Sequence, residues 1–195
     1  MKHVLKMDTA NIIVFFLVLC LFGCSTRQVV DTFSGSTEQR LLTHSIDKLM
    51  RSLPEKDFSS LTGESIFLET VFVLDSSVCA YATARLKKEL EERYRCVIVD
   101  TPGEADRELF VFFTSLGTGN DKAGLSTPPL MVPGMGGTMA IDILALDMYH
   151  GVAELYYYLR DPATGTTTRG ERVKAVIRTD SLATPVLTIP ISTLP

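Results

Sequence analysis

Hydrophobic and polar positions alternate along this chain with two different periods, and each period predicts a type of element. Between residues 36 and 53, apolar side chains recur at steps of three and four, which predicts an amphipathic helix that Pro54 ends. Ser36 and Gln39 have the spacing of a capping pair at its start. A second helix is predicted after Asp75-Ser76-Ser77, with a charged outer face and an apolar stripe at Val78, Ala82, Leu86 and Leu90.

Short apolar runs predict strands on either side of the second helix. The runs at 66–74, 96–99 and 108–116 are rich in β-branched and aromatic residues, which is typical of buried strands. Because a helix separates the first two runs, they form a predicted βαβ unit with parallel strands. Further strands are expected at 139–148 and 152–160, joined by a tight turn at Tyr149-His150-Gly151, and at 172–178.

Two segments show neither period. Residues 117–137 hold six glycines and three prolines, which predicts a long loop. Residues 181–195 hold three prolines and no charge, which predicts an extended strip on the surface. The elements together predict an α/β two-layer sandwich, in which a mixed sheet of five or six strands is covered on one face by two helices.

The N-terminus has the three zones of a secretory signal. Lys2 and Lys6 are followed by an unbroken apolar run of 11 residues, 12–22, and then by small and polar residues. A helix needs roughly 20 apolar residues to cross a bilayer, so the run is too short for a permanent transmembrane helix.

The end of this signal resembles the lipobox of bacterial lipoproteins. Leu21, Gly23 and Cys24 match that pattern, whereas Phe22 is bulkier than the residue usual there. The resemblance implies cleavage between Gly23 and Cys24 and diacylation of the cysteine, which would anchor the chain to a membrane. Ser25 takes the place of the aspartate that favours inner-membrane retention, which implies the outer membrane, facing the periplasm.

Cleavage would leave 172 of the 195 residues, a suitable length for one domain. We therefore expect a signal peptide at 1–23, a tether at 24–35, a single α/β domain at 36–180 and an extended tail at 181–195. The net charge of −4 and the absence of a basic stripe disfavour nucleic acid as a partner.

Candidate chemistry is sparse in the mature sequence. His44 and His150 have no partners at metal-ligand spacing, and Met131, Met135 and Met139 lie among helix-breaking residues, so we expect no metal site and no cofactor. We find no nucleophile elbow and no complete phosphate loop, and therefore predict no catalytic residue.

Cysteines and carboxylates add three narrower expectations. Cys79 and Cys96 lie at opposite ends of the second helix, roughly 25 Å apart, so we predict two separate buried thiols. Asp142 and Asp147 differ in parity along one predicted strand and should face opposite sides. Glu69 interrupts an apolar strand, and we favour a position in water or near an edge over a buried functional carboxylate.

Several segments together resemble a family of uncharacterised bacterial lipoproteins whose domain has no known function. The resemblance covers roughly residues 37–170 and implies no activity, so it assigns no functional residues. Ala105-Asp106 before a strand and the Thr164-Gly165 turn also give an architectural likeness to the curli-export lipoprotein and to lipoprotein activators of cell-wall synthases, which are assembly or regulatory proteins. The family resemblance rests on Thr37–Leu42 with Ile46-Asp47, Leu61–Thr70, Glu104–Val111 and Asp161–Gly165.

These observations favour a lipid-anchored periplasmic protein without enzymatic activity that binds a protein partner or assembles with itself. One alternative is a cell-envelope hydrolase, which would gather Glu69 or Asp142 with a second acid in a pocket. Another is a carrier of a small apolar ligand or lipid, which would need a cavity between helices and sheet. The candidate contact residues are Met131, Met135, Val186, Leu187, Ile189 and Ile191.

Overall fold

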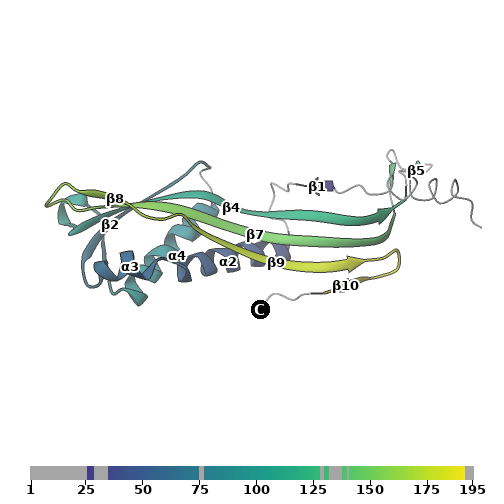
Figure 1. The fold of residues 1–195 in the computed structure, drawn as a ribbon, viewed down its shortest axis with the longest axis horizontal. Coiled ribbons are helices and arrows are strands. Elements are labelled where there is room, and N and C mark those ends of the chain that lie inside the picture. The colour runs from purple at the N-terminus through teal and green to yellow at the C-terminus, as the bar shows by residue number, and fades with distance from the viewer. Residues whose placement is uncertain are drawn as a thin grey trace, which may run out of the picture.

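The computed structural model describes residues 26–28, 35–74, 77–127, 130–131, 138–139 and 141–191. These residues form helices at one end of the molecule and a long sheet that projects beyond them (Figure 1). The helices are α2 (Ser36–Arg51), α3 (Glu55–Phe58) and α4 (Ser77–Arg93), with 3-10 turns η1 (Ser59–Leu61) and η2 (Pro102–Glu104). The strands are β1 (Thr26–Gln28), β2 (Ser65–Phe72), β3 (Val97–Val99), β4 (Arg107–Ser126), β5 (Leu130–Met131), β6 (Thr138–Met139), β7 (Asp142–Arg160), β8 (Thr167–Arg169), β9 (Val173–Ala183) and β10 (Thr188–Pro190).

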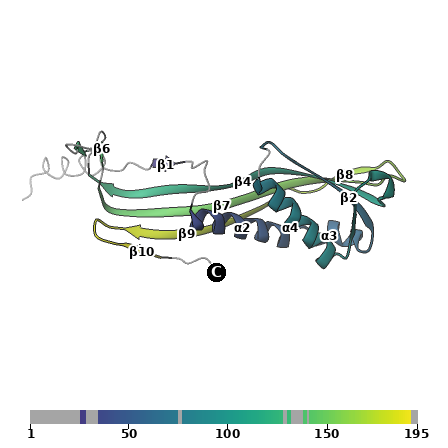
Figure 2. The same ribbon diagram turned by 180° about the vertical axis from the view of Figure 1, so that it is seen from behind.

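The described residues form a mixed sheet with the strand order β10-β9-β7-β4-β2-β3. β2 runs parallel to both β3 and β4, while β4, β7, β9 and β10 pair antiparallel. β1 adds to β4 and β8 adds to β7, which makes eight strands. With α2 and α4 on the same side of the sheet (Figure 2), the predicted α/β two-layer class is confirmed, with more strands than expected.

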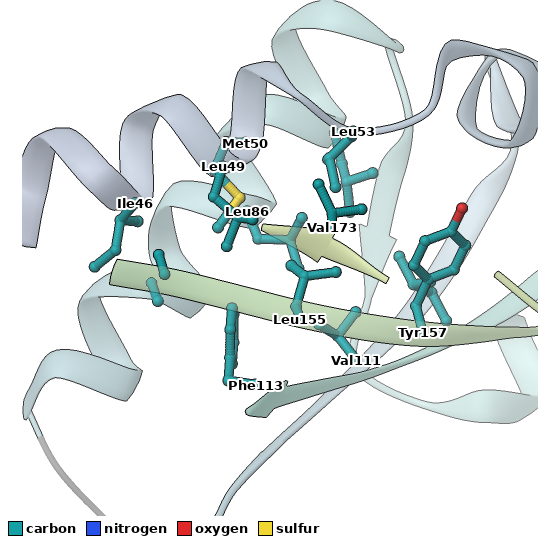
Figure 3. Close-up of a cluster of buried hydrophobic side chains, with 14 of the residues drawn as sticks. Ile46, Leu49, Met50, Leu53, Leu86, Val111, Phe113, Leu155, Tyr157 and Val173 are labelled. Carbon is teal, nitrogen blue, oxygen red and sulfur yellow. The ribbon is translucent and has the colours of Figure 1, made fainter. Parts of the chain in front are cut away.

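The hydrophobic core lies between the helices and one end of the sheet. The predicted stripe of α2 is buried there, with Ile46 and Leu49 fully enclosed, and Leu86 comes from α4. Leu155 and Tyr157 of β7 meet these helices because side chains two residues apart share a sheet face (Figure 3). We call this part of the molecule the head.

Helix α2 approaches the sheet most closely at Gly151. A Cβ placed on this glycine would lie 2.3 Å from the carbonyl oxygen of Leu41, so the residue must lack a side chain. The absence of a side chain at Gly151 therefore allows helix and strand to pack closely together. The predicted turn at Tyr149-His150-Gly151 is wrong, because β7 runs without interruption from Asp142 to Arg160.

The predicted loop at 117–137 is also wrong over its first ten residues. β4 continues to Ser126 and pairs with β7 along its whole length, so backbone hydrogen bonds to a long partner outweigh the low strand propensity of its glycines. β5 and β6 lie further along this segment, and its other residues from 132 to 137 lie outside the described part of the chain.

Two terminal features differ from expectation in detail. The N-cap of α2 is Gly35, which makes no side-chain cap, so Ser36 is the first helical residue instead of the cap. The tail begins inside β9, and β10 folds back on that strand, so the segment to Ile191 is not a separate strip. Backbone pairing thus gives the tail a fixed place at one edge of the sheet.

Candidate functional site

The sheet beyond the helices is the most distinctive surface of the molecule. We call it the arm, and it consists of β1, residues 119–126 of β4, 142–150 of β7, 178–183 of β9, and β10. α2 begins at Ser36, and its first turn reaches only the end of the arm nearest the head, where Glu38 acts on Tyr149, so no helix of the described chain covers the rest of the arm (Figure 1).

Strict alternation along the paired strands gives the arm two different faces. One face continues the side of the sheet on which the helices pack; it is mostly polar, and we call it the polar face. The opposite face is mostly aliphatic toward the tip, and we call it the apolar face. The polar face carries Asn120, Lys122, Ser126, Asp142, Asp147, Thr179 and Ser181. The apolar face carries Ala123, Leu125, Leu144, Leu146, Met148, Leu182 and Ile189.

An ion cluster around Lys122 organises the polar face. Its Nζ donates to the carboxylate of Asp142 and lies 3.7 Å from Asp147, while the Ser126 hydroxyl donates to Asp142 at 2.8 Å. The hydrogen bond to Asp142 raises the pKa of Lys122, and bonds from Lys122 and Ser126 lower the pKa of Asp142. The cluster therefore keeps Lys122 and Asp142 ionised at neutral pH.

This cluster corrects the prediction that Asp142 and Asp147 face opposite sides. The register pairs Leu125 with Leu144 but Ser126 with Asp142, so Ile143 is an extra residue in β7. A bulge of this kind reverses the alternation beyond it. Both carboxylates consequently reach Lys122 on the same face.

The apolar face is open to solvent at the tip. Leu125, Leu144 and Ile189 keep 48%, 47% and 48% of their surfaces exposed. Cross-strand pairing places Leu125 beside Leu144, and Leu146 beside Leu182 and then Ile189, so the side chains form one continuous surface. Contiguous exposed apolar surface on a folded protein usually marks an interaction site.

Two rows with charged side chains border the apolar face on the side of the head. His150 Nδ1 lies 3.7 Å from Asp121, and Arg178 donates to Asp180 at 2.6 Å. The hydrogen bond to Asp180 is the main reason why the pKa of Arg178 is raised. The arm thus changes from charged to aliphatic within a few residues along each strand.

The candidate contact residues of the tail belong to the arm or to its turn. Val186 and Leu187 in the β9–β10 turn, Ile189 in β10 and Ile191 after it are all exposed. Met131 contributes to β5, where only the backbone is described, and Met135 lies outside the described residues, as do Gly23 and Cys24.

Both edges of the arm are open among the described residues. β10 pairs only with β9, and β4 has no second partner over residues 123–126, past the three residues that β1 covers. Edge strands with free N–H and C=O groups are templates for pairing with another chain. The arm therefore has the two properties of an assembly surface, which are open edges and an uncovered apolar face.

A cleft of about 500 Å³ in the head is the alternative candidate. Arg107 and Arg160 line it, but they are already engaged, Arg107 with Asp161 and Glu64 and Arg160 with Glu108 at 3.0 Å. Its other polar lining residues include Lys56, Asp57, Tyr157, Thr164, Thr166 and Thr168.

The acids of this cleft are also held by neighbouring groups. Tyr157 donates to Asp57 at 2.5 Å, and burial, followed by that bond, raises the pKa of the tyrosine. Burial opposes ionisation of Asp161, but bonds from Thr164, Arg107 and Ala163 lower its pKa overall. These contacts favour a structural role for the cleft.

Neither carboxylate singled out for a hydrolase reaches this cleft. Glu69 is exposed on β2, as we favoured, and Asp142 belongs to the arm. The interface between helices and sheet, where a carrier would need a cavity, is filled by the buried side chains of the core (Figure 3).

Cys79 and Cys96 form no disulfide bond with each other, as predicted, although Cys79 is only half-buried. Cys96 donates to the carbonyl oxygen of Leu61 at 3.3 Å, and burial raises the pKa of its thiol to about 11. Within the described residues, no three His, Cys, Asp or Glu side chains gather closely enough to hold a metal ion.

Comparison with family models, with curated proteins and with solved structures finds no match to this chain. The helices of the described segments include none that is long and apolar enough to cross a membrane. The site must therefore be interpreted from its own geometry. Sequence reasoning missed the arm, although the alternation of Leu144, Leu146 and Met148 with Ala145, Asp147 and Tyr149 was a signal for it.

Proposed function

We propose that this protein is a lipid-anchored, non-enzymatic assembly component of the bacterial cell envelope, held at the periplasmic side of the outer membrane. The observation that carries the proposal is the uncovered arm with two open edges. The lipobox-like end of the signal, at Leu21 to Cys24, supports the anchor.

The edges of the arm favour a second copy of this chain as the partner. β10 runs antiparallel to β9, β9 to β7 and β7 to β4, so β10 and β4 have opposite directions. The free edge of β10 in one copy can thus continue the antiparallel pattern against residues 123–126 of β4 in a neighbour. Such a contact joins two different surfaces and can repeat from copy to copy.

The outward backbone groups of β10 identify the residue to change. Ile191 donates to Asp180, and Leu187 accepts from Thr184, so alternate residues of this segment face β9. Thr188 therefore directs its N–H toward the open edge, and Thr188→Pro removes this donor without removing a bond to β9.

Thr167 in β8 offers a matched control for this substitution. Thr166 and Gly170 face β7 through their backbone bonds, so Thr167 also lies at an edge with its N–H outward, but in the head. We expect the lipidated protein to form oligomers in detergent, and Thr188→Pro but not Thr167→Pro to shift them to monomer, as measured by light scattering. Monomeric wild type, or equal effects of the two prolines, would contradict assembly through β10.

The anchor is tested separately by metabolic labelling with palmitate. We expect label on the wild-type chain and none on Cys24→Ala. Label on neither chain would show that the cysteine carries no lipid.

A further inference from the structure

The apolar face of the arm needs an occupant that is itself apolar. In the rows nearest the tip it presents only aliphatic side chains across four strands, including Leu125, Leu144 and Ile189, each close to half exposed. The polar face of the same rows carries Lys122, Asp142 and Asp147. Two faces of such different polarity on one uncovered sheet suit a boundary between water and an apolar medium.

The position of β1 indicates which apolar medium lies there. Thr26 pairs with Lys122, so the chain enters the described structure beside the arm and not beside the head (Figure 2). Cys24 precedes Thr26 by two residues, which span at most about 7 Å. A lipid on that cysteine would start close to the row of Lys122 and Ala123, beside the first aliphatic row.

We propose that the apolar face of the arm lies against the bilayer that holds the lipid of Cys24, with its aliphatic side chains in the acyl-chain region. The inference rests on the proposed anchor. Interfacial segments enter a membrane to a depth of roughly 5–10 Å, which suits aliphatic side chains that point into the bilayer from a sheet lying flat on it, with the polar face toward water. The charged side chains of Asp121, His150, Arg178 and Asp180, on the same face but nearer the head, then lie where this face leaves the acyl-chain region and meets the headgroups.

Single tryptophans can test this orientation because the chain contains none. Leu144→Trp places a reporter on the apolar face, and Ser181→Trp places a matched reporter on the polar face of a nearby row. Each lipidated variant is purified in detergent and reconstituted into phosphatidylethanolamine–phosphatidylglycerol vesicles with or without brominated acyl chains. We expect bromine to quench most of the Leu144→Trp fluorescence and to leave Ser181→Trp almost unchanged.

The possible failures are distinguishable. Co-sedimentation with vesicles but no bromine quenching at Leu144→Trp would overturn the membrane-facing arm and leave the anchor standing. A Leu144→Trp reporter shielded from aqueous iodide but not quenched by bromine would mean that a second copy covers the face, which also overturns the inference. Protein that does not co-sediment would overturn the anchor and, with it, the inference.

Discussion

Burial decides the chemistry of Cys96 at the scale of a single residue. The thiol is enclosed near η1 and β3, its pKa is raised to about 11, chiefly by burial and then by Glu64, and its proton is directed at the carbonyl of Leu61. The thiolate is the reactive form of cysteine, and a thiol with so high a pKa forms almost none at neutral pH. Cys96 therefore behaves as a small, unreactive core residue.

We therefore predict that Cys96 resists alkylation at neutral pH while the protein is folded. Half-buried Cys79 should react first with iodoacetamide, and Cys96 should react only after unfolding, as followed by peptide mass spectrometry. Denatured protein, in which both cysteines react, is the control. Equal rates at the two cysteines in folded protein would show that Cys96 is not enclosed.

Gly151 supports a second prediction at this scale. Gly151→Ala forces a Cβ toward the Leu41 carbonyl, a backbone atom that cannot rotate away, so we expect a loss of about 1–3 kcal/mol in the free energy of unfolding. Gly117→Ala on the neighbouring strand meets nothing within 4 Å and should be close to neutral. Urea denaturation of both variants makes the comparison, and equal losses would exclude the close contact as the cause.

At the scale of elements, hydrophobic periodicity predicted α2, α4 and the order of the first strands, because each of these elements has one buried face and one solvent-exposed face. β4 and β7 were predicted too short, since Gly117, Gly119 and Gly151 looked like turn residues. Those glycines instead lie in ladders, where long partner strands fix the backbone; imidazole atoms of His150 come close to Gly119, and helix atoms come close to Gly151. Close approach depends on tertiary structure, so a single sequence could not distinguish it from a turn.

The Lys122 cluster should make the stability of the arm depend on pH. The pKa of Asp142 in the folded protein is lower than its ordinary value of 3.8. The ionised carboxylate therefore stabilises the fold fully when the pH is well above 3.8, and this stabilisation is lost as the pH falls from 3.8 toward the folded pKa. Both side chains are about one-third exposed, so the contribution is at most about 1 kcal/mol.

We expect Lys122→Met to lower the free energy of unfolding at about pH 6 and to change it less at about pH 3, because the stabilisation from Asp142 is already partly lost below its ordinary pKa of 3.8. Lys88→Met removes an exposed pair with Glu91 on α4 and serves as the control. A Lys122→Met loss that stays constant between the two pH values would show that packing, and not charge, is responsible.

At the scale of the whole molecule, the core is confined to the head while the backbone ladder continues into the arm. Amide exchange should follow that division, because regions with few buried apolar contacts open at lower free energy. We predict slow hydrogen exchange in β4 near Leu109 to Phe113 and faster exchange near Asp121 to Ser126, measured by mass spectrometry in detergent. Reconstitution into vesicles should slow exchange in the arm alone, and an unchanged arm would count against contact with lipid.

β7 joins the head to the arm as one uninterrupted strand, so a rotation of the head is transmitted to the far end of the arm. The ten residues from Asp142 to Gly151 extend roughly 30 Å from the point where α2 holds the strand. If the sheet stays stiff, a rotation of about 10° at the head moves the far end by about 5 Å, roughly one interstrand spacing. A small tilt of the head, caused by whatever binds there, would therefore change which backbone groups meet between neighbouring arms.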